Sequence, residues 1–180
     1  NLLLSQTIRC SEILKNLSRD QFREDKFVSD IRIADLLDKI VDSFGEITTK
    51  EISLIKQENK LNPKIKRTLE ITYGLRNFIG NAVKYSDSKV IINLRSNEAI
   101  TEVEVRDNGP GFSEDVKDVL GEPYIRSKNK IINSKSGLGL GTFIGKTLLE
   151  RMKAKIEFGN DGELKGAYVK IKWQTKNLLN

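Results

Sequence analysis

Histidine is missing from all 180 residues of this sequence. The chain therefore holds neither a histidine-based metal site nor a His-dependent acid–base triad of its own. Cysteine occurs once, at Cys10, which excludes an internal disulfide and agrees with a reducing cytosol. Because Cys10 lies on the apolar face of a predicted helix, we expect it to serve as a small apolar side chain and not in redox chemistry.

Long apolar runs are also missing, and no stretch approaches the roughly 20 apolar residues that a membrane-spanning helix needs. The first residues, Asn1–Leu4, have no basic lead and no initiator Met, so we expect a fragment boundary there and not a signal peptide. Basic residues outnumber acidic ones by 31 to 25, but they are spread along the chain without interleaved aromatics. We therefore expect no nucleic-acid partner. The 38% hydrophobic content is enough for one packed core.

Hydrophobic periodicity predicts helices and strands that alternate along the chain. We expect helices at 1–19, 33–44, 64–85, 113–120 and 141–153, and strands at 51–57, 89–94, 100–106, 155–158 and 167–173. Gly45 and Gly121 are expected to end the helices before them. The polar residues 18–30 predict a linker, and the turn at 160–162 predicts a hairpin between the last two strands.

The hexapeptide DNGPGF, at 107–112, directly follows an alternating strand pattern. Asp107 is an acceptor-only group that can take a hydrogen bond from an exocyclic amine. Gly109 and Gly111 lack a Cβ, which would let the backbone approach a flat ligand closely, and Pro110 stiffens the turn between them. A simple strand-end turn accounts for the same residues, so this segment alone leaves both interpretations open.

A polar stripe is predicted on one face of the helix that ends at Tyr85. Asn77, Asn81 and Lys84 recur at i, i+4 and i+7, opposite an apolar side made by Leu75, Phe78, Ile79, Ala82 and Val83. Amide oxygens are hard ligands for magnesium, and a lysine can pair with phosphate. The alternative is an ordinary exposed helix face.

Residues 122–136 are rich in Lys, Asn and Ser and show no hydrophobic period, which predicts a long functional loop. Arg126 in this loop could contact phosphates. A solvated basic loop without a function is the alternative. The glycine-rich run GLGLG, at 137–141, then opens a helix and would present free N–H groups to an anion. It is not a dinucleotide-binding fingerprint, because Thr142 stands at the last glycine position. It is not a phosphate-binding loop either, because Leu140 stands at the first glycine and Phe143 and Ile144 are expected to be buried.

Taken together, the segments 75–86, 107–112 and 137–141, followed by a helix with Lys146 and Glu150, resemble the catalytic, ATP-binding domain of sensor histidine kinases. These kinases belong to a larger group of proteins that includes gyrase, a heat-shock chaperone and the mismatch-repair ATPases. The order and spacing match over roughly 30–175, and the helix at 141–153 is most similar to the RegB/PrrB-type kinases. The resemblance implies a two-layer α/β sandwich of a mixed sheet and helices for residues 27–180. Residues 1–26 would be part of a dimerisation and phosphoacceptor hairpin with a linker.

The resemblance also implies a role for each motif residue. Asn81 would bind magnesium with Asn77 nearby, Lys84 would contact phosphate and Tyr85 would pack near the adenine. Asp107 would accept from the adenine amino group, with Gly109 and Gly111 admitting the base. Residues 113–136 would form a lid in which Tyr124 replaces a usual Phe and Arg126 contacts phosphate. The phosphates would lie on the run Gly137, Leu138, Gly139, Leu140 and Gly141. Leu138 stands where Thr or Ser is common, and Thr142 where Leu is common.

The implied activity is transfer of the γ-phosphate of ATP, with magnesium, to a histidine on a dimerisation helix, and from there to a response regulator. The full-length protein would be a homodimer, with this cytoplasmic domain attached to a membrane anchor. Hydrolases of the group carry a Glu where this chain has Asn77, and an amide cannot take a proton from water. Two alternatives remain at this point: a serine kinase acting on an anti-anti-sigma partner, and a binding module without enzymatic activity.

Overall fold

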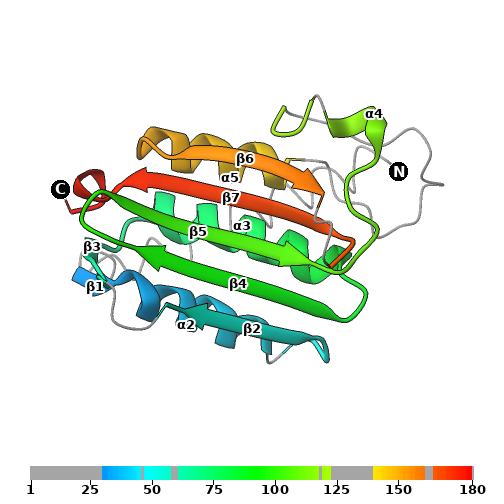
Figure 1. Cartoon of the computed structure of the whole chain (residues 1–180), viewed down its shortest axis with the longest axis horizontal. Coiled ribbons are helices and arrows are strands. Elements are labelled where there is room, and N and C mark those ends of the chain that lie inside the picture. The colour runs from blue at the N-terminus through cyan, green and yellow to red at the C-terminus, as the bar shows by residue number, and fades with distance from the viewer. Residues whose placement is uncertain are drawn as a thin grey trace, which may run out of the picture.

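The computed structural model describes residues 30–45, 47–57, 61–117, 119–122, 140–160 and 164–179. They form two layers, a five-stranded sheet and a set of helices packed on one of its faces (Figure 1). The strands are, in spatial order, β2 Glu51–Lys56, β4 Lys89–Ser96, β5 Ile100–Asp107, β7 Ala167–Gln174 and β6 Lys155–Asn160. β2 runs parallel to β4 and the other neighbours are antiparallel, so the sheet is mixed. The expected two-layer α/β sandwich is confirmed.

The helical layer consists of α2 Ile33–Gly45, α3 Leu69–Tyr85 and α5 Gly141–Arg151. The middle helix, α3, contacts both α2 and α5. The side of α3 that was predicted to be apolar is buried, and Phe78 and Ile79 are among the most deeply buried side chains. Below it, the sheet contributes Ile92, Ile171 and Trp173 to the same core. No helix in the described part of the chain has the length and apolar character to cross a membrane.

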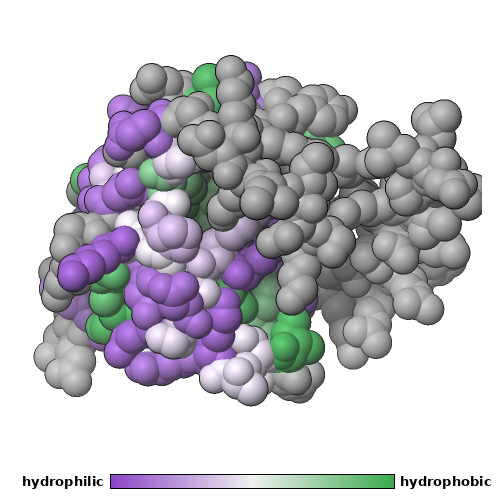
Figure 2. All heavy atoms as spheres, turned by 90° about the vertical axis from the view of Figure 1, so that its right-hand side faces the viewer, coloured by the Kyte–Doolittle hydropathy of each residue, from purple (hydrophilic) through white to green (hydrophobic). Residues whose placement is uncertain are grey.

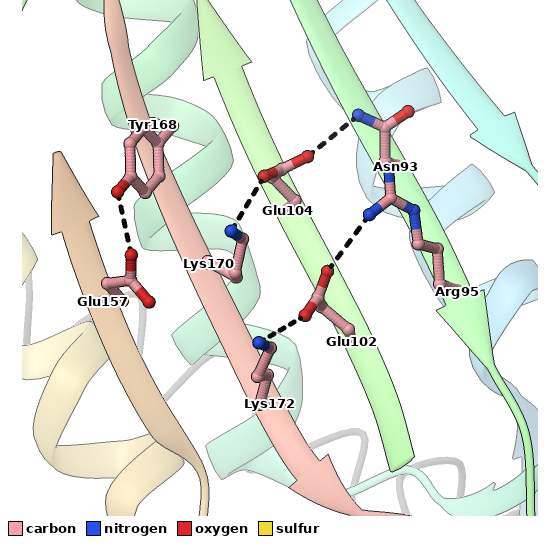
Figure 3. A network of polar contacts seen from close by, with 8 residues as sticks. All are labelled: Asn93, Arg95, Glu102, Glu104, Glu157, Tyr168, Lys170 and Lys172. Carbon is pink, nitrogen blue, oxygen red and sulfur yellow. Dashed lines mark hydrogen bonds and ion pairs between the residues drawn. The ribbon is translucent and has the colours of Figure 1, made fainter. Parts of the chain in front are cut away.

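The other face of the sheet carries charged side chains paired across strands (Figure 3). Glu102 on β5 lies between Arg95 on β4, at 3.6 Å, and Lys172 on β7, at 3.0 Å. Glu104, two residues further along the same strand, also has a partner on each neighbouring strand. Since Val103 and Val105, which alternate with these two residues, are buried in the core, β5 alternates as a half-buried strand does, and the two faces of the sheet differ clearly.

The predicted helix at 64–85 is wrong at its beginning. Lys64–Lys66 forms a short strand, β3, that pairs antiparallel with β1 Asp30–Arg32, at the end of the expected linker. Ile65 is only 1% exposed, so burial of this side chain accompanies the pairing. The helix begins at Leu69, where the Thr68 hydroxyl accepts a hydrogen bond from the N–H of Ile71 at 3.4 Å.

Replacing Thr68 with Ala should lower the free energy of unfolding by about 1 kcal/mol, because α3 would lose the side-chain acceptor at its first turn. Urea unfolding measures this as a lower midpoint with an unchanged slope. Thr147→Ala, at an exposed position within α5, is the matched control and should change stability by less than about 0.5 kcal/mol. Equal midpoints for Thr68→Ala and the control would show that this cap contributes nothing.

Three smaller expectations also differ from the structure. The short helix predicted at 113–120 is limited to α4 Glu114–Lys117, and the turns after it lead to Gly121, which has a φ of +91°. Ile144 was expected to be buried, but its side chain is 36% exposed because it lies on the solvent side of α5. A short 3-10 helix, η2 Thr175–Asn177, follows the last strand. The predicted helix at 1–19, with Cys10, lies outside the described residues.

Candidate functional site

The predicted site residues that the structure describes lie at one end of the sandwich, on the right-hand side of Figure 1, where β5 and α3 end. β5 ends there at Asp107, α3 ends at Tyr85, and β7 begins at Ala167. α5 begins against the last turns of α3, since Gly141 approaches Asn77 and Asn81. Figure 2 views this end directly, and its described surface is largely hydrophilic. The topology therefore brings together segments that are far apart in the sequence.

Asp107 is the buried carboxylate of this end, with 5% of its surface exposed. Its Oδ1 accepts hydrogen bonds from the N–H of Gly109 at 2.8 Å and from the N–H of Ala167 at 3.3 Å. Burial raises the pKa of Asp107 above its ordinary value, although these two N–H donors act in the opposite direction. Among the described residues, no hydrogen bond reaches Oδ2 of Asp107. Within the described residues, the backbone thus fixes one oxygen of Asp107, and the other could accept from a ligand's donor.

The two glycines of the DNGPGF turn are needed by the protein itself. A Cβ on Gly109 would overlap the carbonyl oxygen of Tyr85, so the turn lies directly against the end of α3. Gly111 has a φ of +72°, in the left-handed region that favours glycine. A Cβ there would lie 2.9 Å from Oδ1 of Asn160. Close packing within the chain is a sufficient reason for both glycines, in addition to the expected approach of a ligand.

Several residues that were not predicted from the sequence support this turn or the end of α3 beside it. Asn160 accepts from the N–H of Phe112 at 2.7 Å and donates to its carbonyl at 2.9 Å. Gly166 packs so closely on Asp107 that a Cβ would overlap the backbone there. Lys50 donates to the carbonyl of Val83 at 2.6 Å, at the end of α3. Each is at least 33 residues from its partner in the sequence, so no local pattern points to it.

Asn77 and Asn81 face the beginning of α5. Nδ2 of Asn77 donates to the carbonyl of Tyr73 at 2.8 Å, and Nδ2 of Asn81 donates to the hydroxyl of Thr142 at 3.1 Å. A Cβ on Gly141 would lie 3.3 Å from Oδ1 of Asn77, so the two helices approach closely at this point. Within the described part of the chain, neither amide oxygen accepts a hydrogen bond. As far as the described residues go, both oxygens could therefore bind a ligand.

The remaining predicted site residues are placed as follows. Lys84 and Tyr85 are exposed at the end of α3, and Nζ of Lys84 lies 5.0 Å from the centre of the Tyr85 ring. Leu140 precedes α5, and its carbonyl accepts from the N–H of Ile144 at 2.8 Å. The other predicted residues lie outside the described residues: Tyr124, Arg126, Gly137, Leu138 and Gly139. The structure therefore brings together Asn77, Asn81 and Gly141 as one group, and Asp107, Gly109 and Tyr85 as a second.

The donor set at this end fits a hard cation held together with phosphates. Within the described residues, no group of three or more His, Cys, Asp or Glu side chains could hold a metal ion. The amide oxygen of Asn81 is a hard ligand, and magnesium commonly takes one or two protein oxygens and completes its shell with waters and substrate phosphates. The amide oxygens of Asn77 and Asn81 are thus the described groups at this end of the sheet that could hold a hard cation.

Comparison with known proteins places this geometry in a family. Residues 67–177 match the family model described as histidine kinase-, DNA gyrase B-, and HSP90-like ATPase. The sensor histidine kinase RegB of Cereibacter sphaeroides is 27% identical over 197 residues, which cover 99% of this chain and 42% of that protein. The sensor protein QseC of Escherichia coli is 30% identical over 177 residues, covering 94% of this chain and 37% of QseC.

Solved structures agree on the fold. The mycobacterial sensor histidine kinase MprB superposes with a TM-score of 0.68 at 18% identity, over 81% of this chain and 97% of the MprB chain. The chain spans less than half the length of RegB and QseC, so those proteins contain segments that are not matched here. The expected similarity to RegB-type kinases is confirmed. Because the family model matches residues 67–177 and the fold agrees with it, the chain belongs to the histidine kinase-, DNA gyrase B- and HSP90-like ATPase family.

Proposed function

We propose that this chain is the catalytic, ATP-binding part of a two-component sensor histidine kinase. The observation that carries the proposal is the placement of Asp107, buried at the end of the central strand β5, with one oxygen fixed by two backbone N–H groups and the other accepting no hydrogen bond from the described residues. A buried acceptor of this kind suits the amino group of adenine. The amide pair on α3 and the beginning of α5 lie at the same end of the sandwich, which suits the phosphate end of the same ligand.

The residues would divide the work as follows. Asp107 would hold the adenine, with Gly109 and Gly111 giving it room and Tyr85 beside it. Asn81 would bind magnesium, and Asn77 and Lys84 would contact the phosphate region. Magnesium would neutralise charge on the phosphates. The glycine-rich run from Gly137 to Gly141 would complete the phosphate site, and Tyr124 and Arg126 would belong to the segment that closes over it.

The acceptor in this proposal is a histidine on a dimerisation helix outside this chain. Asn77 cannot act as a general base for water, so we expect slow hydrolysis and a nucleophile activated elsewhere. The chain would supply positioning and charge neutralisation, which are the main sources of rate in phosphoryl transfer. Residues 1–26 would belong to the dimerisation hairpin. The full-length protein would be a homodimer with its catalytic part in the cytoplasm, and a response regulator would receive the phosphate.

The direct test uses radiolabelled ATP and magnesium with the chain alone, and then with a fragment that carries the dimerisation hairpin of the same protein. We expect acid-labile label in the added fragment only, because this chain has no histidine to accept it. Asn81→Ala serves as the impaired control. Fast phosphate release by the chain alone, abolished by replacing an acidic residue, would identify an ATPase and end the kinase proposal. Acid-stable label on a serine of a partner would instead support the serine-kinase alternative.

Asn81→Ala should lower the affinity for ATP about tenfold in magnesium and change it little in a chelator. The reason is that the substitution removes one oxygen ligand from an octahedral shell but no contact to the base. Calorimetric titration under both conditions measures the difference. Asn93→Ala, on the outer face of the sheet, should leave both affinities unchanged. A loss of the same size with and without magnesium would argue against a metal role for Asn81.

A further inference from the structure

Thr142 makes a side-chain contact that the sequence pattern does not suggest. It lies in the first turn of α5, and its hydroxyl oxygen accepts a hydrogen bond from Nδ2 of Asn81 on α3 at 3.1 Å. Both side chains are half-buried. The contact joins residues 61 positions apart, at the point where the two helices come together.

The partner of an Asn amide decides which way its oxygen points. The amide has a donor end and an acceptor end, and a hydroxyl that accepts from Nδ2 directs Oδ1 to the opposite side. Asn77, one turn earlier, is fixed in the same sense, because its Nδ2 donates to the carbonyl of Tyr73 at 2.8 Å. In the described part of the chain both nitrogens are thus occupied, and both oxygens accept no hydrogen bond. This is the orientation that a cation requires.

We propose that Thr142 is a positioning residue for the Asn81 amide, and that it sets how strongly nucleotide affinity depends on magnesium. The inference rests on the proposed function. Without the hydroxyl, the amide of Asn81 could rotate, and part of the population would present its NH₂ group to the cation. A hydrogen bond between neutral side chains has a modest net effect, so we expect a change of about 3- to 10-fold.

The test compares three variants in calorimetric titrations with ADP, in magnesium and in a chelator. Thr142→Val has nearly the same shape as Thr but lacks the hydroxyl, Thr142→Ser keeps the hydroxyl, and Thr147→Val makes the same change at an exposed position of α5. We expect Thr142→Val to lose about 3- to 10-fold of the affinity measured in magnesium and little of that measured in the chelator. Thr142→Ser and Thr147→Val should resemble the unmodified chain. Thr142→Ala provides a smaller replacement if the Val variant does not fold.

A second readout does not involve nucleotide. In the ¹⁵N-labelled chain, the side-chain NH₂ of Asn81 should exchange more slowly with solvent than in Thr142→Ala, because the hydrogen bond protects it. Equal exchange in the two proteins would overturn the inference. So would an equal affinity loss with and without magnesium in Thr142→Val, or no loss in either condition, while the unmodified chain binds magnesium–ADP normally. An unmodified chain that binds no nucleotide would overturn the proposed function together with this inference.

Discussion

Replacing Asp107 with Asn should weaken ATP binding by about 10- to 100-fold, which corresponds to losing one hydrogen bond to a charged acceptor. In the folded chain, Oδ1 of Asp107 is occupied by the N–H groups of Gly109 and Ala167. The substituted amide can keep these two bonds with its own oxygen, but it then presents NH₂ where Asp107 presents Oδ2. The adenine amino group would meet a donor in place of an acceptor. Calorimetric titration with ATP measures the loss.

The same substitution should not unfold the chain, so a loss of affinity can be assigned to the contact itself. Burial raises the pKa of Asp107 in the folded state. For a group whose pKa is raised by folding, ionisation costs stability as the pH rises through that pKa, and at neutral pH the folded chain bears this cost. The neutral amide of Asn removes it. We therefore expect an unfolding free energy at pH 7 that is equal to or higher than that of the unmodified chain.

The matched control for Asp107→Asn is Asp87→Asn, at an exposed carboxylate close enough to influence Asp107 electrostatically. It removes the same charge from the same region without touching the turn, so ATP affinity should stay within about twofold of the original. Unchanged affinity in Asp107→Asn would remove the adenine assignment. Equal losses of ATP affinity in the two variants would show that the effect comes from the lost negative charge and not from a contact with the adenine.

Gly166→Ala should destabilise the chain by about 3 kcal/mol or more, because it places a methyl group in fully occupied space. A Cβ at this position would overlap the backbone carbonyl of Asp107 and come within 2.6 Å of its Oδ1. The obstacle is the backbone at the end of β5, where Asp107 pairs with Val90 of β4, and it cannot rotate away as a flexible side chain would. Any relaxation must move Asp107, so nucleotide affinity should fall as well.

Urea unfolding measures the stability change, with Gly45→Ala as the control. Gly45 ends α2, and a Cβ there would meet no atom within 4 Å. The control should therefore leave the unfolding midpoint unchanged or raise it slightly, since Ala restricts the unfolded chain more than Gly does. A Gly166→Ala variant with the midpoint of the unmodified chain would show that the junction between β5 and β7 is looser than described.

Local sequence patterns predicted most of the elements of this fold. The helix expected at 33–44 is α2 Ile33–Gly45, and the strand expected before DNGPGF is β5 Ile100–Asp107. Both have enough residues for a hydrophobic period to show. The three residues of β3, Lys64–Lys66, are too few for a period, and what defines them is pairing with β1. Pairing with a distant strand, and not local propensity, therefore determines the conformation of this segment, which was predicted to be helical.

In the candidate site, too, local patterns predicted some residues and missed those whose partners are distant in the sequence. Asp107, Asn77 and Asn81 were predicted because carboxylate and amide groups stand at a strand end and along one helix face. Thr142 and Gly166 were not identified as site residues, because their significance comes from partners about 60 residues away. In the sequence, Thr142 stands near the start of a predicted helix and Gly166 near a predicted hairpin. Neither position indicates which residue packs against it. In the folded chain, the Thr142 hydroxyl contacts Asn81, and Gly166, which has no side chain, packs against the backbone of Asp107.

A crystal structure of this chain with magnesium and a non-hydrolysable ATP analogue would show directly whether the nucleotide binds here. We expect the adenine amino group to donate to the carboxylate of Asp107, and Oδ1 of Asn81, on α3, to bind magnesium opposite the beginning of α5. An analogue bound at another surface, or one whose base makes no contact with Asp107, would contradict the assignment of this end of the sandwich as the ATP site.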